Sequence, residues 1–366
     1  MVSGSRYLWY PYRAKLTFPT EKHENVTYDT PRRENLIRPT KAPEEDSFLL
    51  ETTNNVIAEA SSKPSFKSLN RSDRELFNNF CTKTCFTLQG DPVQQSVWQI
   101  SVPKLALSFD FVMDGILALS ALHLAYLYPS QKGFYISQAQ TRHDIGLCRA
   151  GKLLLHITQE NCSGLYIFSV LAAIYTLASP RKPKDLLLVG ETGISIFRGN
   201  HTIMESSRAA LMSGPLGPML KNGWQRTQLR ESCTNKTSIE EGQLNVLRHL
   251  ITEMIPDPTT FNIYAQAIEE LRKSFAAFNP HYNHGATDVF TWVHRVSEEY
   301  LLLLRNQTQE SLCILAFFCV LLHQMNSVWW SEGQSTHLMT QIRLLLDEEH
   351  RQWIWWPVKQ VLTLSG

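Results

Sequence analysis

The sequence is nearly without net charge. Lys and Arg total 35 and Asp and Glu total 34, which gives the 366-residue chain a formal net charge of +1. A chain this close to neutral lacks the overall positive charge that marks many nucleic-acid-binding proteins, although a local basic patch is still compatible with it. Cysteine is also scarce. The seven cysteines are scattered and odd in number, which excludes a small disulfide-stapled scaffold.

Long hydrophobic runs are missing as well. The first 20 residues contain no apolar run of the roughly 7–15 residues that a signal peptide needs. The longest apolar stretches, 165–178 and 312–322, are shorter than the roughly 18–20 residues that cross a bilayer. We therefore expect an intracellular protein without a membrane span.

The sequence also has few patterns typical of β-strands, because Val, Ile and Thr rarely alternate with polar residues. With 43% hydrophobic residues the chain can bury a sizeable core, and the apolar residues follow helical spacing. Helices are predicted at 109–127, 130–157, 160–177, 239–255, 259–278, 288–304, 310–325, 334–346 and 348–363. No fixed-period repeat supports a solenoid. The prediction is an all-α, multi-helix domain of about ten or more helices, preceded by a flexible N-terminal arm.

The arm is predicted from composition. Residues 22–46 mix charges and prolines and have no apolar period, so we expect 1–69 to be extended or disordered. Order is expected to begin at Ser72, where Ser72 and Glu75 have the spacing of a capping box. The helical domain then covers 70–363. Within it, the glycine-rich stretch 181–242 is predicted to form loops around short helices.

Motifs for enzyme chemistry are weak. Residues 146–152 read GLCRAGK, the first seven positions of a phosphate-binding loop, but Leu153 follows and no strand precedes them. A helix with small residues at a close packing contact is the favoured alternative. Cys81 and Cys85 have no further metal ligands nearby in sequence, so buried apolar cysteines are favoured over zinc.

Histidine and charge clusters also have structural interpretations. His281 and His284 fall in a predicted loop without catalytic partners, and no HExxH or GxSxG pattern occurs. The acidic run 347–350 is expected to cap a helix. The basic run 180–184 suits either nuclear import or a solvated turn. The sequence thus predicts no catalytic residues, no metal ligands, no cofactor and no identified DNA-binding residues.

Three residues are candidates for ligand binding. The helices predicted at 109–127 and 160–177 are apolar around much of their circumference, and each carries an isolated polar group, His123 and Tyr175. The C-terminal part holds five of the nine tryptophans, including Trp330. Such residues can line a pocket for a mostly apolar ligand. The alternative is a close-packed core in which His123 is a buried, hydrogen-bonded histidine.

Several short segments of the chain resemble the helical regulatory domain of fungal zinc-cluster transcription factors, and they occur in the same order as in that family. The resemblance is closest to the sterol-uptake-control branch and covers about residues 70–362. The matching segments are VPKLALSF at 102–109, MDGILALSALHLA at 113–125, ENC at 160–162, FS at 168–169, 175–180, FRG at 197–199, GPLG at 214–217, ILAFFCVLLH at 314–323, WW at 329–330 and LLDEEHRQWIWWP at 345–357.

The resemblance implies a transcription regulator, not an enzyme, located in the nucleus or alternatively in the cytoplasm. It implies control of sterol, lipid or secondary-metabolite pathway genes through a domain that senses an apolar, sterol-like or lipid-like molecule or docks a partner. The partner would be another zinc-cluster factor in a homo- or heterodimer. This chain departs from the family in having no cysteine before Cys81, so its own contact with DNA is in doubt.

Two other functions stay open. One is a non-DNA-binding interaction protein that pairs with a full-length relative. The other is a metabolite-pathway enzyme on a helical scaffold.

Overall fold

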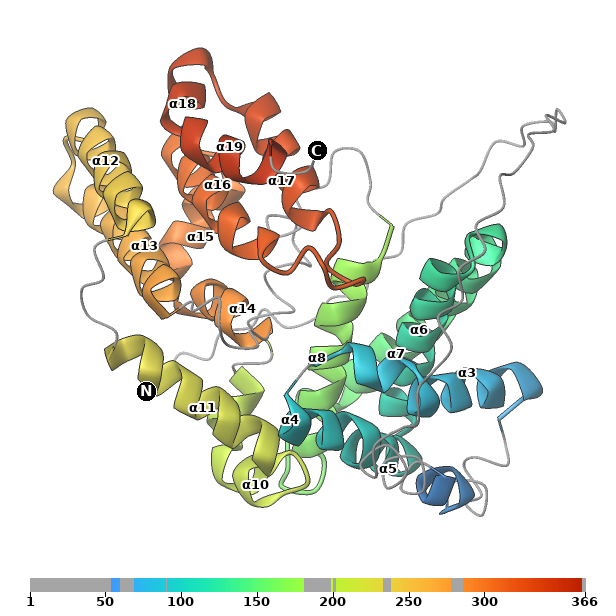
Figure 1. The fold of residues 1–366 in the computed structure, drawn as a ribbon. Coiled ribbons are helices and arrows are strands. Elements are labelled where there is room, and N and C mark those ends of the chain that lie inside the picture. The colour runs from blue at the N-terminus through green and yellow to red at the C-terminus, as the bar shows by residue number, and fades with distance from the viewer. Residues whose placement is uncertain are drawn as a thin grey trace, which may run out of the picture.

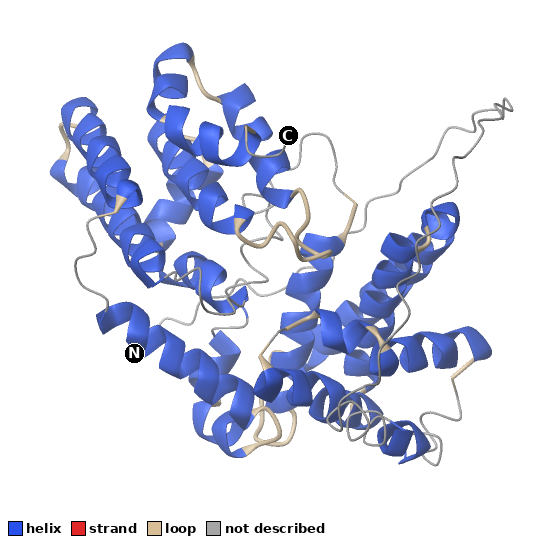
Figure 2. Ribbon diagram, viewed as in Figure 1, coloured by secondary structure: helices blue, strands red, loops and turns tan. Residues whose placement is uncertain are grey.

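The computed structural model describes residues 54–59, 69–89, 91–180, 199, 202–232, 238–277 and 286–363. Helices make up the regular structure of these residues, and no strand occurs among them (Figure 2). The predicted all-α fold of about ten or more helices is therefore confirmed. Most of the predicted arm lies outside the described residues. Residues 54–59, inside that arm, form a short helix with Val56 buried. The domain division at residue 70 stays a prediction.

The helices form two groups, which Figure 1 shows side by side. The first group surrounds α6, which packs against α3, α5, α7 and α8. Its helices are α3 (Arg71–Thr82), α4 (Pro92–Ser96), α5 (Val102–Ser108), α6 (Asp110–Leu127), α7 (Lys132–Leu153) and α8 (Cys162–Ala178). Helix α6 is apolar on nearly all sides because neighbours cover it on nearly all sides.

Helix α6 is also long and apolar enough to cross a membrane when judged by length and composition alone, in contrast to the shorter apolar stretches at 165–178 and 312–322. Of its 18-residue apolar window, 78% is buried inside the protein. A core helix needs the same composition, so packing within the first group accounts for it.

The start of α3 differs from the prediction. The N-cap is Asn70, whose Oδ1 accepts a hydrogen bond from the Asp73 backbone N–H at 2.8 Å. Ser72 is the second residue of the helix, and its Oγ accepts a hydrogen bond from Gln138 Nε2 at 2.9 Å. Both residues have side chains that cap helices well, so the capping box at Ser72 was a wrong choice between two local candidates.

Close packing explains the motif at 146–152. Gly146 and Gly151 both lie inside the uninterrupted helix α7, so the favoured alternative to a phosphate-binding loop is confirmed for Gly146. A Cβ atom on Gly146 would lie 2.8 Å from Phe168 Cε2 of α8. The missing side chain thus lets α6, α7 and α8 approach closely.

An ion-pair cluster around two buried carboxylates joins helices of the first group. Asp114 of α6 accepts hydrogen bonds from Arg142 at 3.2 Å and from Arg149 at 2.6 Å, and Arg142 also pairs with Asp73 of α3. Burial raises the pKa of Asp114, and the two guanidinium groups oppose that shift. The cluster fixes the mutual register of α3, α6 and α7, since breaking one partner would leave a buried charge unpaired.

The second group surrounds α16, which packs against α13, α15, α17, α18 and α19. Its helices are α12 (Ile239–Met254), α13 (Pro258–Ala277), α14 (Ala286–Arg295), α15 (Glu298–Arg305), α16 (Gln309–His323), α17 (Gln334–Leu345), α18 (Glu348–Trp353) and α19 (Trp355–Leu362). Two predicted helices are each split in two, with Ser297 capping α15 and a break at Ile354. Asp347 caps α18 as predicted, accepting from the His350 N–H at 2.9 Å.

Helices α10 (Arg208–Ser213) and α11 (Gly217–Ser232) connect the two groups. At 16 residues, α11 is longer than the short helices predicted for the glycine-rich stretch. Its Arg230 is 3% exposed and donates to the Glu270 carboxylate of α13 at 2.7 Å. This long-range pair anchors α11 on the second group and is invisible to local sequence patterns.

Candidate functional site

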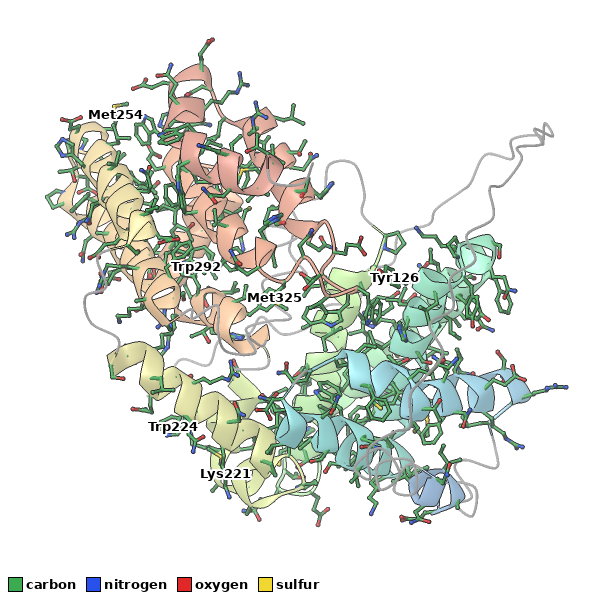
Figure 3. All side chains as sticks on the ribbon, in the orientation of Figure 1. Tyr126, Lys221, Trp224, Met254, Trp292 and Met325 are labelled. Carbon is green, nitrogen blue, oxygen red and sulfur yellow. The ribbon has the colours of Figure 1, made fainter. Side chains whose placement is uncertain are left out.

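The two groups of helices meet at the segment 324–333, which precedes α17. Trp329 Nε1 donates to Thr87 Oγ1 at 2.8 Å, and Gln334 Nε2 donates to the Leu177 carbonyl of α8. The Trp329 ring also stacks on His123 of α6, with ring centroids 4.9 Å apart. Figure 3 places Tyr126 and Met325 on the facing sides of this junction.

Beside this junction lies a pocket of about 580 Å³, which we call the inter-group pocket. Its apolar wall comes from α8, α10, α11, α14 and the residues around α4. The residues of this wall are Leu88, Trp98, Tyr166, Val170, Ala173, Ile174, Leu177, Met204, Met212, Met219, Leu220, Gly223, Trp224, Phe290 and Trp330. The volume falls within the roughly 300–1,000 Å³ of small-molecule sites, and the mostly apolar lining is typical of them.

Charged side chains lie along one part of the pocket. Arg208 stacks over the Trp224 ring at 4.5 Å from its centroid and pairs with Glu205. Arg295 of α14 pairs with Glu231 at 3.6 Å. Trp224 projects from α11 (Figure 3). The arginines in the lining are thus balanced by carboxylates, and the remaining wall is mainly apolar.

Of the three residues predicted to bind ligand, Trp330 lines the inter-group pocket. Its side chain is 2% exposed. Its Nε1 atom is buried and has no hydrogen-bond partner among the residues that the structure describes. A buried donor without a partner is uncommon, because it loses its bonds to water without replacement.

His123 lies on α6, outside the pocket lining. Its Nδ1 is 3.0 Å from Thr84 Oγ1, and its ring stacks on the Trp329 ring. Burial lowers the pKa of His123 to about 4, so the imidazole is neutral at pH 7. This environment corresponds to the buried, hydrogen-bonded histidine that was the alternative to a ligand contact.

Tyr175 also lies outside the pocket lining, on a different face of α8 from Val170 and Ala173. Its ring stacks on His143 of α7, with centroids 3.7 Å apart and planes 12° apart. Burial raises the pKa of Tyr175 to about 12 and lowers that of His143 to about 4. Both groups are therefore neutral over the physiological range and help to pack α7 on α8.

Most of the pocket residues were not predicted from the sequence. Helix α8 and Trp330 were expected, whereas α6 supplies no residue to the lining. Met204, Arg208, Met219 and Trp224 come from the stretch that was predicted to form loops around short helices. A local signal existed in the apolar residues Met212, Met219 and Leu220, but the glycines and prolines among them concealed the helical spacing.

Cys81 and Cys85 are buried within the first group of helices. Cys85 Sγ donates to the Cys81 carbonyl, and burial raises the pKa of Cys85 to about 12 and that of Cys81 still further. Both are therefore thiols, which are poor nucleophiles and poor metal ligands. In the described part of the chain, no three His, Cys, Asp or Glu residues are grouped to hold a metal ion. His281, His284 and the basic residues 181–184 lie outside the described residues.

Two curated proteins are similar to this chain. One is a "Zn(2)-C6 fungal-type transcription factor" of Gibberella zeae, 24% identical over 79% of this chain and 61% of the relative. The other is "Sterol uptake control protein 2" of Saccharomyces cerevisiae, 28% identical over 31% of this chain and 12% of the relative. The chain thus spans less than two thirds of each relative.

No family model matches the chain. Both relatives are nevertheless named as fungal regulators, and the longer similarity extends over most of the sequence. The predicted resemblance to fungal zinc-cluster transcription factors, with a sterol-uptake-control protein among the similar sequences, is therefore confirmed.

Proposed function

We propose that this chain is a transcription regulator whose helical domain senses an apolar, sterol-like or lipid-like molecule in the inter-group pocket. The observation that carries the proposal is the pocket of about 580 Å³ between the two groups of helices. A ligand there contacts α8 on one side and α11 and α14 on the other. Its binding energy therefore depends on how the two groups are arranged, which couples occupancy to conformation.

The similar proteins support the regulatory part of the proposal. A fungal zinc-cluster factor acts on genes, so we place this chain in the nucleus, with sterol, lipid or secondary-metabolite pathway genes as its targets. The partner we propose is a second zinc-cluster chain, in a homo- or heterodimer.

The test of ligand sensing is a thermal-unfolding screen of the purified chain with sterols and long-chain lipids. A ligand present at 100 times its dissociation constant adds about 2.7 kcal/mol to the free energy of unfolding. We expect at least one compound of this class to stabilise the protein. A folded protein that no sterol or lipid stabilises would contradict the proposed pocket function and favour a pure interaction protein.

A large side chain placed inside the inter-group pocket should weaken ligand binding and so reduce the thermal stabilisation. Val170 of α8 lines the pocket and is partly buried, so Val170→Trp places a large side chain in the ligand's space. We expect the stabilising ligand to bind at least about tenfold more weakly, which corresponds to about 1.4 kcal/mol. Thr176→Trp is the matched control, because Thr176 is on the same helix and outside the lining. Equal loss of binding in both variants would contradict a site in this pocket.

A further inference from the structure

The last turns of α14 form one part of the wall of the inter-group pocket. The residues of this helix that line the pocket are Phe290, Thr291, His294 and Arg295. On the opposite side of the helix, the Trp292 ring stacks on Phe318 of α16, with ring centroids 4.8 Å apart. Arg295 is therefore held at the pocket by a helix that is anchored in the second group. Its side chain is 43% exposed, so its guanidinium group is accessible to a ligand.

The carboxylate partners of the two arginines in the pocket engage them to different extents. Arg208 donates a hydrogen bond to Glu205 and also stacks over the Trp224 ring. Arg295 lies 3.6 Å from Glu231, which is longer than a hydrogen bond, and has no closer acceptor among the residues that the structure describes. The N–H groups of Arg295 can therefore still donate to a further anion.

The carboxylate beside Arg295 is shared with two other cations. Glu231 accepts hydrogen bonds from Arg230 and Lys273, each at 3.1 Å. Both cations also donate to Glu270 of α13. Within the described parts of α11, α13 and α14, this cluster thus joins three cations to two carboxylates and has an excess of one positive charge. Arg295 carries that excess, because it is the most exposed of the three cations and the least closely paired.

We propose that the ligand of the inter-group pocket is an amphiphile with an apolar tail and one carboxylate, which binds the guanidinium group of Arg295. The inference rests on the proposed function and narrows it to a ligand of the fatty-acid type, in preference to an uncharged sterol. A guanidinium group can donate two parallel hydrogen bonds to a carboxylate. One carboxylate also matches the excess of one positive charge, whereas a phosphate monoester with two negative charges exceeds it.

Arg295 has a structural effect as well. It lies in the last turn of α14, where a positive charge interacts favourably with the helix dipole. That effect contributes to the free energy of unfolding, but it predicts no dependence of ligand affinity on the head group of the ligand. The test therefore measures the binding of probes that share one tail and differ in their head groups.

The probes are dodecanoate, dodecan-1-ol, dodecyl phosphate and dodecyltrimethylammonium, each added to the full chain below the concentration at which it forms micelles. The pH is about 8, where a phosphate monoester is a dianion. Displacement of the uncharged dye Nile red measures the dissociation constants. We expect dodecanoate to bind at least about tenfold more tightly than dodecan-1-ol, because it gains a charge-assisted hydrogen bond. We expect dodecyl phosphate to bind more weakly than dodecanoate, and the ammonium probe most weakly.

The variant Arg295→Gln should bring dodecanoate down to the affinity of dodecan-1-ol and leave the binding of the alcohol unchanged. Arg272→Gln is the matched control, because Arg272 donates to Glu269 at 2.8 Å and lies outside the pocket lining. That control should keep the preference for dodecanoate. Glu231→Gln should strengthen the binding of dodecanoate, since it removes the carboxylate that competes for Arg295. Damage to the fold does not explain a stronger and head-group-selective binding.

The outcomes separate this inference from the proposed function. Equal binding of dodecanoate and dodecan-1-ol, or a preference for dodecanoate that persists in Arg295→Gln, would overturn this inference while the pocket function stands. Tighter binding of dodecyl phosphate would overturn the assignment of a single carboxylate, and tightest binding of the ammonium probe would overturn the role of Arg295. If neither these probes nor any sterol bound to the folded protein, the pocket function and this inference would fail together.

Discussion

At the scale of single residues, the molecule holds two histidines in their neutral form. His123 and His143 are buried, and burial lowers the pKa of each to about 4. The unfolded chain keeps the ordinary value of about 6.5 and so binds protons more readily between pH 6.5 and 4. Stability is therefore fully present above pH 6.5 and is lost as the pH falls through this window.

His143→Phe isolates one of these contributions. Phenylalanine retains a ring to stack on Tyr175 and cannot take a proton. For a shift of this size we expect His143 to account for up to about 3 kcal/mol of the stability lost by pH 4, from 1.36 kcal/mol per pKa unit. Urea unfolding at several pH values measures the slope. A variant with the same slope as the wild type would show that His143 is not the group being titrated.

The sequence predicted the burial of His123 but did not predict which residues His123 contacts. An apolar helix around His123 indicates burial, and burial requires a hydrogen-bond partner, which is Thr84 from 39 positions earlier in the chain. Tyr175 was selected for the same reason and stacks on His143 instead of lining the pocket. The face of a helix that a residue occupies follows from spacing, but the neighbour that covers the face does not.

At the scale of helices, glycine decides how closely α7 and α8 approach. Gly146→Ala puts a Cβ 2.8 Å from Phe168 Cε2, which is 3% exposed and has little room to move. Overpacking of this kind costs about 1–3 kcal/mol. Gly151→Ala on the same helix meets nothing within 4 Å and should gain about 0.5–1 kcal/mol from helix propensity. Chemical denaturation of both variants checks the opposite signs. Stabilisation by both substitutions would refute the packing contact.

Long apolar helices such as α6, α8 and α16 were predicted within a few residues because their composition depends on burial on many sides. Their ends were less certain, since Asn70 and Ser72 both have side chains that cap helices. The length of helix α11 was underestimated, because a contact that holds it, between Arg230 and Glu270, joins residues 40 positions apart. The lining of the inter-group pocket includes both kinds of helix: α8 was predicted from the sequence, and α11 was not.

At the scale of the whole molecule, charge and composition bear on contact with DNA. The chain has a formal net charge of +1 and carries no Cys-x₂-Cys-x₆-Cys spacing. Affinity for duplex DNA depends on the phosphates that Lys and Arg neutralise, and specificity depends on a module that reads base edges. A chain with balanced charge and without such a module should therefore bind DNA weakly and without sequence preference.

For the purified 366-residue chain at ~150 mM salt, we expect a dissociation constant for duplex DNA of about 10⁻⁴ to 10⁻⁶ M, or weaker. This is the range typical of proteins that contact only the phosphates. A mobility-shift titration with random and competitor duplexes measures it. Adding a zinc-cluster partner chain should lower the apparent constant if that partner supplies the DNA-reading module, and the ligand of the inter-group pocket should then modulate the complex. Nanomolar, sequence-selective binding by the chain alone would contradict this prediction and place the DNA contact on the helical domain itself.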